Sequence, residues 1–268
     1  MLHAWFWAKE GCLPRRSYAA PPPPSTMTSK QKYTNPQLCQ GLKLHQVPMK
    51  LATNENLKGM GVVVDDPEDF TVEKRTFEIA TWPTSGWRKM DPGCGDEAGT
   101  CEGKFDIYWD GDLLYGKNHS IATTSNHYLL GYGKEPTACV KARRGEGPAE
   151  SPETVRLWYS DYHPDGGQLF FPEDGQPFVT NLAPPLGDDV KPSDFTAFYV
   201  PAGKGCYIHP GVWHNAVYTH PSTGTDRTFF NRQGRVHARI SVNWAEEFGV
   251  LMQVPLTWPP KASFFSAE

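Results

Sequence analysis

Two histidines flank a tight turn in the second half of the chain, and their spacing is suited to chemistry. His209 is followed by Pro210-Gly211, a dipeptide typical of tight turns, and His214 comes soon after it. Imidazole is the commonest metal ligand and titrates near neutral pH, so a histidine delivered by such a turn suits metal binding or proton transfer. The alternative is a histidine satisfied by hydrogen bonds in an ordinary β-protein, and this segment alone leaves both readings open.

The residues after the turn are expected to form a strand. The run 213–218 is rich in aromatic and β-branched residues. Alternation along a strand would send one set of side chains to one face and the other set to the opposite face. The first set is His214, Ala216 and Tyr218, and the second is Trp213, Asn215 and Val217.

An earlier segment, 154–163, reads as a strand whose one face changes character at its end. Its alternate residues are apolar or aromatic until the last two, Asp161 and His163. Polar residues at the end of an apolar strand face are expected at a barrel mouth, where a ligand would meet them. A turn over 164–167 then reverses the chain, and Gln168 opens the partner strand.

The spacing of four residues resembles the metal site of cupins, which usually has His-x-His, then a glutamate, and a further histidine after a Pro-Gly turn. The four residues are Asp161, His163, Gln168 and His214. Asp161 stands where cupins usually carry a histidine, and Gln168 where they usually carry a glutamate. An oxygen-rich set with two imidazoles favours Mn, Fe or Ni over structural zinc. We therefore expect a divalent metal held by these four residues, with metal-free catalysis as the open alternative.

Composition predicts a loop-rich β-protein. The 268 residues include 25 Gly and 25 Pro, and short β-branched or aromatic runs recur at 60–65, 75–82, 104–109, 126–132, 195–200 and 236–244. Asp110-Gly111 predicts a hairpin turn. We expect an all-β, cupin-like double-stranded β-barrel or jelly roll with long loops and few short helices.

The net charge and the pattern of apolar residues limit the kinds of partner expected for this chain. A net charge of −4 gives no electrostatic reason for binding nucleic acid, and no apolar run approaches the length of a membrane span. The six cysteines include no Cys-x-x-Cys pair and predict no zinc site. A soluble cytoplasmic protein is expected. The alternative is an organelle, mitochondrial or peroxisomal, because residues 1–30 carry basic but few acidic residues.

The domain organisation is expected to be simple. Residues 1–30, with the proline run 21–24, predict a disordered or targeting extension, or an upstream start with Met27 as the true initiator. Residues 31–268 predict one cupin-like domain with an extended first half, in which the role of 82–150 is open.

Four segments of the second half resemble the ureidoglycolate lyase family. They are Asp-Tyr-His-Pro-Asp-Gly-Gly-Gln-Leu-Phe-Phe-Pro over 161–172, Pro-Phe-Val over 177–179, Leu-Ala-Pro over 182–184 and the run 198–214 that ends in Val-Trp-His. The chain departs from the family pattern at three positions. Gly167 replaces a serine, Asn215 replaces a second histidine, and Asp161 is shorter than the usual glutamate.

The resemblance implies cleavage of the C–N bond of ureidoglycolate to glyoxylate and urea in allantoin breakdown, by a homodimer. In that reaction His163 and His214 would bind the metal or transfer protons, and His209 would be a further acid/base. Gln168 would ligate the metal or bind substrate, Arg232 or Lys204 would hold the carboxylate, and Trp213 would form a wall. The alternatives are another metal-cupin reaction, such as a ureidoglycolate amidohydrolase, and a non-catalytic cupin that binds a small acid.

Overall fold

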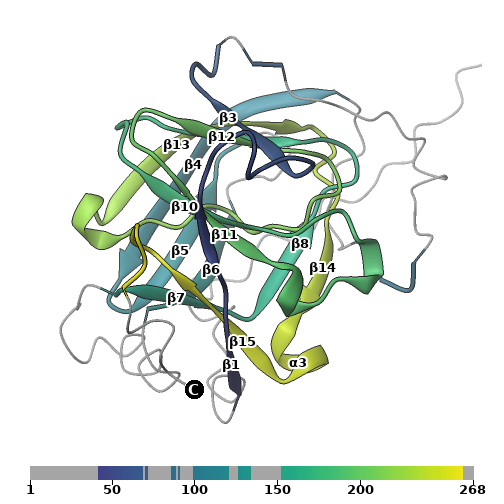
Figure 1. The fold of residues 1–268 in the computed structure, drawn as a ribbon. Coiled ribbons are helices and arrows are strands. Elements are labelled where there is room, and N and C mark those ends of the chain that lie inside the picture. The colour runs from purple at the N-terminus through teal and green to yellow at the C-terminus, as the bar shows by residue number, and fades with distance from the viewer. Residues whose placement is uncertain are drawn as a thin grey trace, which may run out of the picture.

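The computed structural model describes residues 42–68, 70–71, 86–88, 90, 99–120, 126–133 and 152–261. The predicted extension 1–30 and the strand expected at 75–82 lie outside these ranges. The described part is all-β and cupin-like, as predicted (Figure 1). Its longest helix, α3, has 5 residues, and none of the described helices could cross a bilayer.

The strands and short helices follow one another in this order along the described chain: β1 Lys43–Gln46, β2 Met49–Leu51, β3 Gly61–Val64, β4 Thr100–Asp110, β5 Leu113–Asn118, β6 Asn126–Tyr132, β7 Thr154–Leu157, β8 Tyr159–Tyr162, β9 Gln168–Pro172, β10 Phe178–Leu182, η2 Gly187–Asp189, η3 Pro192–Asp194, β11 Thr196–Val200, β12 Gly205–Ile208, η4 Pro221–Thr223, β13 Asp226–Gly234, β14 Ile240–Asn243, α3 Trp244–Phe248 and β15 Val250–Pro255.

Three sheets make up the described fold. The largest has ten strands in the order β1-β15-β7-β6-β5-β4-β13-β9-β12-β3, and the others are β10-β11-β2 and β14-β8. Strands from both halves of the chain alternate in the large sheet, so the first half completes the sheet system that carries the second. The hairpin predicted at Asp110-Gly111 joins β4 to β5, and Gly111 adopts the positive φ of 60° that such a turn requires.

The strand predicted over 154–163 is in fact two. β7 pairs with β15 and β6 in the large sheet, whereas β8 pairs with β14, so the chain changes sheet at Trp158. Barrel-like folds make corners in this way, by strands that bend from one sheet into another. The break leaves the predicted alternation intact, and it places the end of the segment over the barrel interior.

Two other segments predicted as strands also differ from the prediction in the structure. The run 213–218 makes only isolated bridges, including Asp161 to His214 and Val179 to Tyr218, so it is a bridged segment rather than a ladder strand. The strand expected over 236–244 is confined to β14. It starts late because His237 has a positive φ of 47°, and it ends at Asn243, whose side chain accepts hydrogen bonds from the backbone N–H groups of Ala245 and Glu246 and begins α3.

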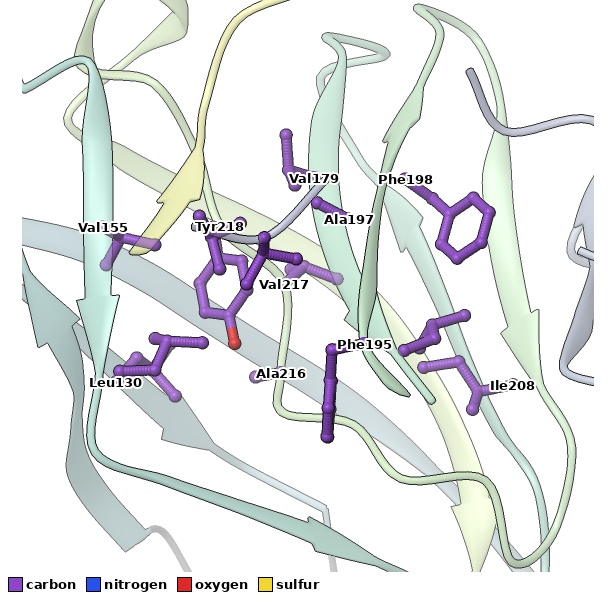
Figure 2. Close-up of a cluster of buried hydrophobic side chains, with 14 of the residues drawn as sticks. Leu130, Val155, Val179, Phe195, Ala197, Phe198, Ile208, Ala216, Val217 and Tyr218 are labelled. Atoms are coloured by element: carbon purple, nitrogen blue, oxygen red, sulfur yellow. The ribbon is translucent and has the colours of Figure 1, made fainter. Parts of the chain in front are cut away.

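The core lies between the sheets. Figure 2 shows Leu130 of β6 and Val155 of β7 on one side, and Val179, Ala197 and Ile208 of the facing strands on the other. The bridged segment 213–218 contributes buried apolar side chains between them. Burial of these apolar surfaces is the main stabilising term, and it fixes the bridged segment without a regular hydrogen-bond ladder.

A buried arginine ties β13 to the loop after β9. The side chain of Arg227 is 1 % exposed, and its Nε and Nη2 donate to the two carboxylate oxygens of Asp174 at 2.7 and 2.8 Å. Burial raises the pKa of the Asp174 carboxyl, but the hydrogen bonds and charge of Arg227 outweigh burial and hold that pKa below its usual value. The pair therefore stabilises the fold above the unfolded pKa of 3.8 and is lost as pH falls through the lower folded pKa.

We expect Asp174→Asn to lower the free energy of unfolding at pH 7 by about 1–2 kcal/mol, a value reduced for the partial exposure of the carboxylate. The difference in unfolding free energy between the wild type and the variant should shrink once the pH falls below about 4, because the Asp174 carboxyl of the wild type then becomes protonated and loses its charge pairing with Arg227. Urea unfolding at several pH values measures both, with the exposed Asp189→Asn as control. A deficit that stays constant across pH would contradict the charge-based account.

Candidate active site

Two connected chambers open inside the described barrel. The inner chamber, about 20 Å³, is lined by Asp161, His163, Gln168, His214, His237 and Arg239 with aromatic neighbours. That volume has room for one water-sized group. The outer chamber, about 380 Å³, shares Tyr128, Tyr159, Asp161 and Arg239 with the inner one.

The four residues predicted to hold a metal all line the inner chamber. Every second residue from Tyr159 in β8 to the residue just after that strand lines this chamber, as the sequence pattern predicted. These residues are Tyr159, Asp161 and His163. Reciprocal backbone hydrogen bonds of 2.9 and 2.8 Å join Asp161 to His214, so the bridged segment brings the second histidine beside them. Gln168, the first residue of β9, faces the same space.

Both histidines are oriented by backbone carbonyl groups. His163 Nδ1 lies 2.9 Å from the Ala238 carbonyl oxygen, and His214 Nδ1 lies 2.8 Å from that of Val212. A carbonyl oxygen only accepts, so in each ring Nδ1 carries the proton and Nε2 is the atom left for ligation or proton transfer. The ring centroids lie 4.9 Å apart.

A chain of buried amides fixes the direction of Gln168. The backbone N–H of Ser120 donates to Asn118 Oδ1 at 2.8 Å, which turns Asn118 Nδ2 toward Gln233 Oε1 at 3.4 Å. Gln168 Nε2 then donates to that same oxygen at 3.0 Å and to Asn231 Oδ1 at 3.2 Å. Because the backbone N–H fixes the first amide, each following amide has one satisfied orientation, and Gln168 Oε1 faces His214.

This arrangement leaves a place for positive charge. Gln168 Oε1 lies 3.2 Å from His214 Nε2, and two lone pairs would face each other there unless a proton or a cation lies between them. The imidazolium form of His214 supplies the proton, and a divalent ion is the alternative. The nearby Asp161 carboxylate favours either positive charge.

A metal site built here would depend on the amide oxygen. Among the described residues, no three His, Cys, Asp or Glu side chains lie together as a metal cluster. His163, His214 and Asp161 therefore do not form such a cluster by themselves, and the divalent metal expected from the sequence stays a prediction.

Burial sets the protonation of the inner chamber. Desolvation lowers the pKa of His163 well below its usual value, and the neighbouring His214 lowers it further. Desolvation also lowers the pKa of His214. The Asp161 carboxylate acts in the opposite direction but does not outweigh burial. At neutral pH the imidazoles are thus available as bases or ligands, and His214 is the one best able to carry a proton.

His237 and Arg239 also line the inner chamber, although sequence reasoning did not assign them to the site. The His237 ring stacks at 4.0 Å on His163, and Arg239 Nε lies 4.0 Å from Asp161 Oδ2. The signal was present in the predicted strand 236–244, since residues 237, 239, 241 and 243 share its alternation and all line one chamber or the other.

His237 is held in an unusual backbone conformation. Its φ of 47° is rare for a residue other than glycine, and the Asp165 carboxylate accepts hydrogen bonds from the backbone N–H groups of His237 and Ala238. Burial raises the pKa of Asp165 to about 6 against these hydrogen bonds. Since the Ala238 carbonyl oxygen receives His163 Nδ1, Asp165 also orients His163.

His209 does not reach either chamber. Its ring packs edge to face on Tyr207 at 5.3 Å, and its backbone N–H donates to Met60. Gly211, with φ of 80°, reverses the chain, so His209 stays beside β12 while His214 enters the chamber. The predicted acid/base role of His209 has no geometric support.

The three other predicted substrate contacts also lie elsewhere. Arg232 pairs with Glu102 at 2.6 Å, because alternation along β13 sends Asn231 inward and Arg232 to the opposite face. Lys204 is exposed in a turn and pairs with Asp65 at 2.6 Å. Trp213 is fully buried in the core, where its Nε1 donates to the Gly187 carbonyl oxygen, so it supports the barrel without lining a chamber.

The Gly167 departure has a packing reason. A Cβ built at Gly167 would lie 2.1 Å from the Tyr207 hydroxyl oxygen, so the aromatic ring occupies the space that a serine side chain would need. The glycine therefore allows the Tyr207 ring to pack directly against the turn before Gln168.

Comparison with known proteins identifies the family of the chain. The sequence model of the family described as Ureidoglycolate lyase matches residues 114–247, half of the chain. The protein described as Ureidoglycolate lyase in Stutzerimonas stutzeri (strain A1501) is 40 % identical over 70 residues, 26 % of this chain and 39 % of that protein. Ureidoglycolate lyase 2 of Rhizobium meliloti (strain 1021) is 34 % identical over 85 residues, 32 % of this chain and 49 % of that protein.

The chain spans less than half the length of these curated relatives. The matched region nevertheless contains both candidate histidines, Gln168 and Arg239. By this match over half of its length, the chain belongs to the ureidoglycolate lyase family.

Proposed function

We propose that this protein cleaves ureidoglycolate to glyoxylate and urea. The observation that carries the proposal is the meeting of two buried imidazoles, Gln168 and Arg239 in one small chamber within the region that matches the family. The reaction breaks a C–N bond at a carbon that also bears a hydroxyl and a carboxylate. It needs a base for the hydroxyl proton, an acid for the leaving nitrogen and a cation for the carboxylate.

Each need has a candidate in the described chain. The inner chamber admits one water-sized group, which is the size of the substrate hydroxyl. In the metal-free reaction His214 Nε2 takes the hydroxyl proton, and the Asp161 carboxylate stabilises the resulting imidazolium. The electron pair of the O–H bond forms the aldehyde C=O as the C–N bond breaks, and the same proton then passes to the leaving ureido nitrogen. His163 lines the same chamber and assists this transfer.

Arg239 is the proposed carboxylate clamp. Its side chain is 35 % exposed and lines both chambers, so the guanidinium can meet a substrate carboxylate at their junction. Bidentate pairing of arginine with a carboxylate supplies orientation as well as binding energy. This assignment replaces Arg232 and Lys204, which are paired away from the site.

Arg239→Ala is expected to lower kcat/KM for ureidoglycolate by roughly 10- to 100-fold, mostly through KM, because a charge-assisted contact to the ground-state carboxylate is lost. Arg239→Lys should recover part of the loss, since it restores charge without the planar fork. Steady-state kinetics measure both. Arg232→Ala is the matched control, and an equal effect of the two alanine variants would remove Arg239 from the clamp role.

The proposal includes a divalent metal as the agent that acidifies the substrate hydroxyl when bound. His163, His214, Gln168 and Asp161 would hold it. The amide chain supports this assignment, because Gln233 keeps the Gln168 oxygen directed at His214.

Gln233→Leu is expected to weaken binding of Mn²⁺ or Ni²⁺ to chelator-treated protein by about 10–100-fold, because Gln168 loses the partner that orients it. Titration calorimetry and metal analysis of the dialysed protein give the result independently of activity. The exposed Gln176→Leu serves as control. Absence of stoichiometric metal uptake by the wild type would favour the metal-free reaction, with His163 and His214 transferring protons.

The decisive assay follows products from racemic ureidoglycolate with purified protein. Glyoxylate and urea in equal amounts support the lyase. Ammonia in place of urea would move the assignment to an amidohydrolase, and failure of well-folded protein to form either product would leave a binding function.

The remaining parts of the proposal concern assembly and location. A homodimer, as in the family, is expected and is measured by light scattering. A cytoplasmic location is the prediction, with an organelle as the alternative, and imaging of the full chain with its own N-terminus distinguishes them.

A further inference from the structure

The outer chamber is much larger than the space around the imidazoles. Its volume of about 380 Å³ falls in the range of ~300–1,000 Å³ typical of sites for drug-sized ligands. Tyr128, Trp158 and Tyr159 form an aromatic wall, in which the rings of Trp158 and Tyr159 lie 4.7 Å apart. Ser241 and Asn243 of β14 add polar groups beside these rings, because Asn243 pairs with Tyr159 where β14 runs along β8.

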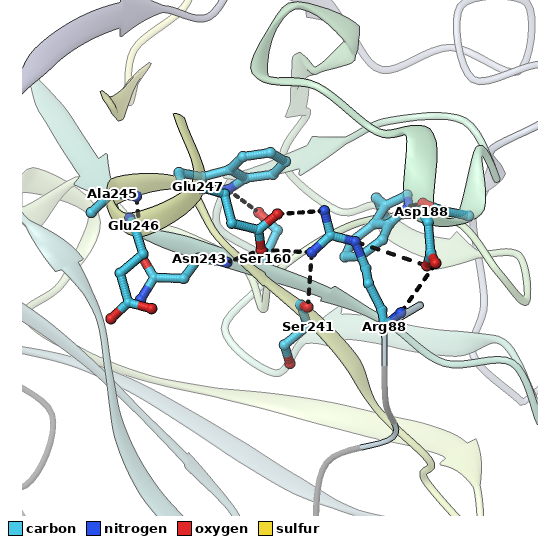
Figure 3. Close-up of polar contacts among 11 residues, drawn as sticks. Arg88, Ser160, Asp188, Ser241, Asn243, Ala245, Glu246 and Glu247 are labelled. Carbon is cyan, nitrogen blue, oxygen red and sulfur yellow. Dashed lines mark hydrogen bonds and ion pairs between the residues drawn. The ribbon is translucent and has the colours of Figure 1, made fainter. Parts of the chain in front are cut away.

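The polar part of the lining is held in place by Arg88, which lies outside the family-matched region. Figure 3 shows the Arg88 guanidinium between Glu247, Ser241 and Asp188. Its Nη1 and Nη2 donate to the two Glu247 carboxylate oxygens at 2.6 and 2.7 Å. A bidentate pair of this kind, between a buried arginine and a partly exposed carboxylate, joins α3 to β14 at the chamber wall.

The same pair sets the charge of the outer chamber. Glu247 lines the chamber but has both carboxylate oxygens occupied by Arg88, so it offers little attraction to a cationic group. Asp161 and Arg239 stand together at the junction with the inner chamber. The outer chamber is thus lined by aromatic rings together with neutral polar side chains.

The position of the reacting centre directs a substrate into this space. The inner chamber has room for the hydroxyl, and Arg239 holds the carboxylate at the junction. The ureido group is the remaining large substituent on the reacting carbon, so it extends into the outer chamber. Its distal nitrogen then faces a space large enough for a further group.

We propose that the substrate class of this site, resting on the proposed lyase function, is N-substituted ureidoglycolates whose distal nitrogen carries a neutral, planar apolar group. The reaction remains balanced. The hydroxyl proton leaves, the carbinol C–N bond breaks, the nitrogen accepts that proton, and the products are glyoxylate and the N-substituted urea.

The test compares ureidoglycolate with its N-phenyl derivative, with glyoxylate measured for both. We expect kcat/KM to be about tenfold higher for the N-phenyl compound, because a phenyl ring is buried against the aromatic wall. Ser241→Phe, which fills the outer chamber, should reverse this preference. The ratio of the two substrates in one protein sample cancels differences in the folded fraction, and Ser222→Phe, on an exposed residue outside both chambers, should keep the wild-type ratio.

Binding of N-phenylurea, followed by calorimetry, separates failure of this inference from failure of the lyase assignment. Turnover of ureidoglycolate without a preference for the N-phenyl compound, and without N-phenylurea binding, overturns the substrate class but leaves the lyase. No turnover of either compound, with N-phenylurea binding that Ser241→Phe removes, overturns the lyase while the outer chamber keeps its ligand class. A ratio unchanged by Ser241→Phe overturns the placement of the phenyl group.

Discussion

His214→Ala is expected to lower kcat for glyoxylate formation by about 10²–10⁴-fold, the range typical for loss of a general acid/base group. His214 is 3 % exposed, and its Nε2 faces Gln168 Oε1 at 3.2 Å across the inner chamber. No other described imidazole combines this contact with the neighbouring Asp161 carboxylate that favours its protonated form.

A conservative variant separates chemistry from folding. His214→Asn can keep a donor near the Val212 carbonyl oxygen, which His214 Nδ1 now supplies at 2.8 Å, but it provides no group in place of Nε2. His214→Asn should therefore have a higher free energy of unfolding than His214→Ala and an equally low kcat. Product assays and urea unfolding measure the two effects, with His220→Asn, outside both chambers, as control. Activity of His214→Asn within a few-fold of the wild type would exclude Nε2 as the reacting atom.

Arg88→Met is expected to lower the free energy of unfolding by about 2 kcal/mol, a value typical of hydrogen bonds to charged groups, because the Glu247 carboxylate stays partly exposed. The Arg88 side chain is 3 % exposed and the Glu247 side chain 27 %, so both charges lose solvent in the fold. The guanidinium also lies 5.7 Å from the Trp213 ring centroid, and Asp188 lies 3.9 Å from its Nε. Removing Arg88 leaves two carboxylates without their shared cation.

A double-mutant cycle measures how much of this stability belongs to the pair. Urea unfolding of Arg88→Met, Glu247→Gln and the double variant should give a positive coupling energy, because Glu247→Gln leaves the buried Arg88 guanidinium without its charged partner. Lys58→Met, on an exposed residue, should change stability little. Coupling near zero would mean that Arg88 stabilises the protein by packing alone. The chamber wall would then not depend on the ion pair.

Much of the candidate site was determined by local sequence. The alternation of Asp161 and His163, the turn before Gln168 and the Pro-Gly turn before His214 each specify local geometry, and all four side chains meet in the inner chamber. The all-β, cupin-like fold followed from the same local signals, short apolar runs separated by turn formers. Local steric and hydrogen-bonding rules are sufficient for the alternation and the turns, because each involves residues close in the chain. The meeting of His214 with Asp161 joins distant segments, and the sequence predicted it only through the resemblance to the cupin site.

Only the tertiary structure decided which other side chains join them. Arg232 was a reasonable clamp by composition, but the register of β13 turns it away and sends Asn231 and Gln233 inward. Arg239 enters instead because β14 pairs with β8, which is a contact between distant segments. The role of Arg88 likewise depends on Glu247, far along the chain. Pairing register and burial are collective outcomes of packing the whole barrel, so a single segment of sequence does not specify them.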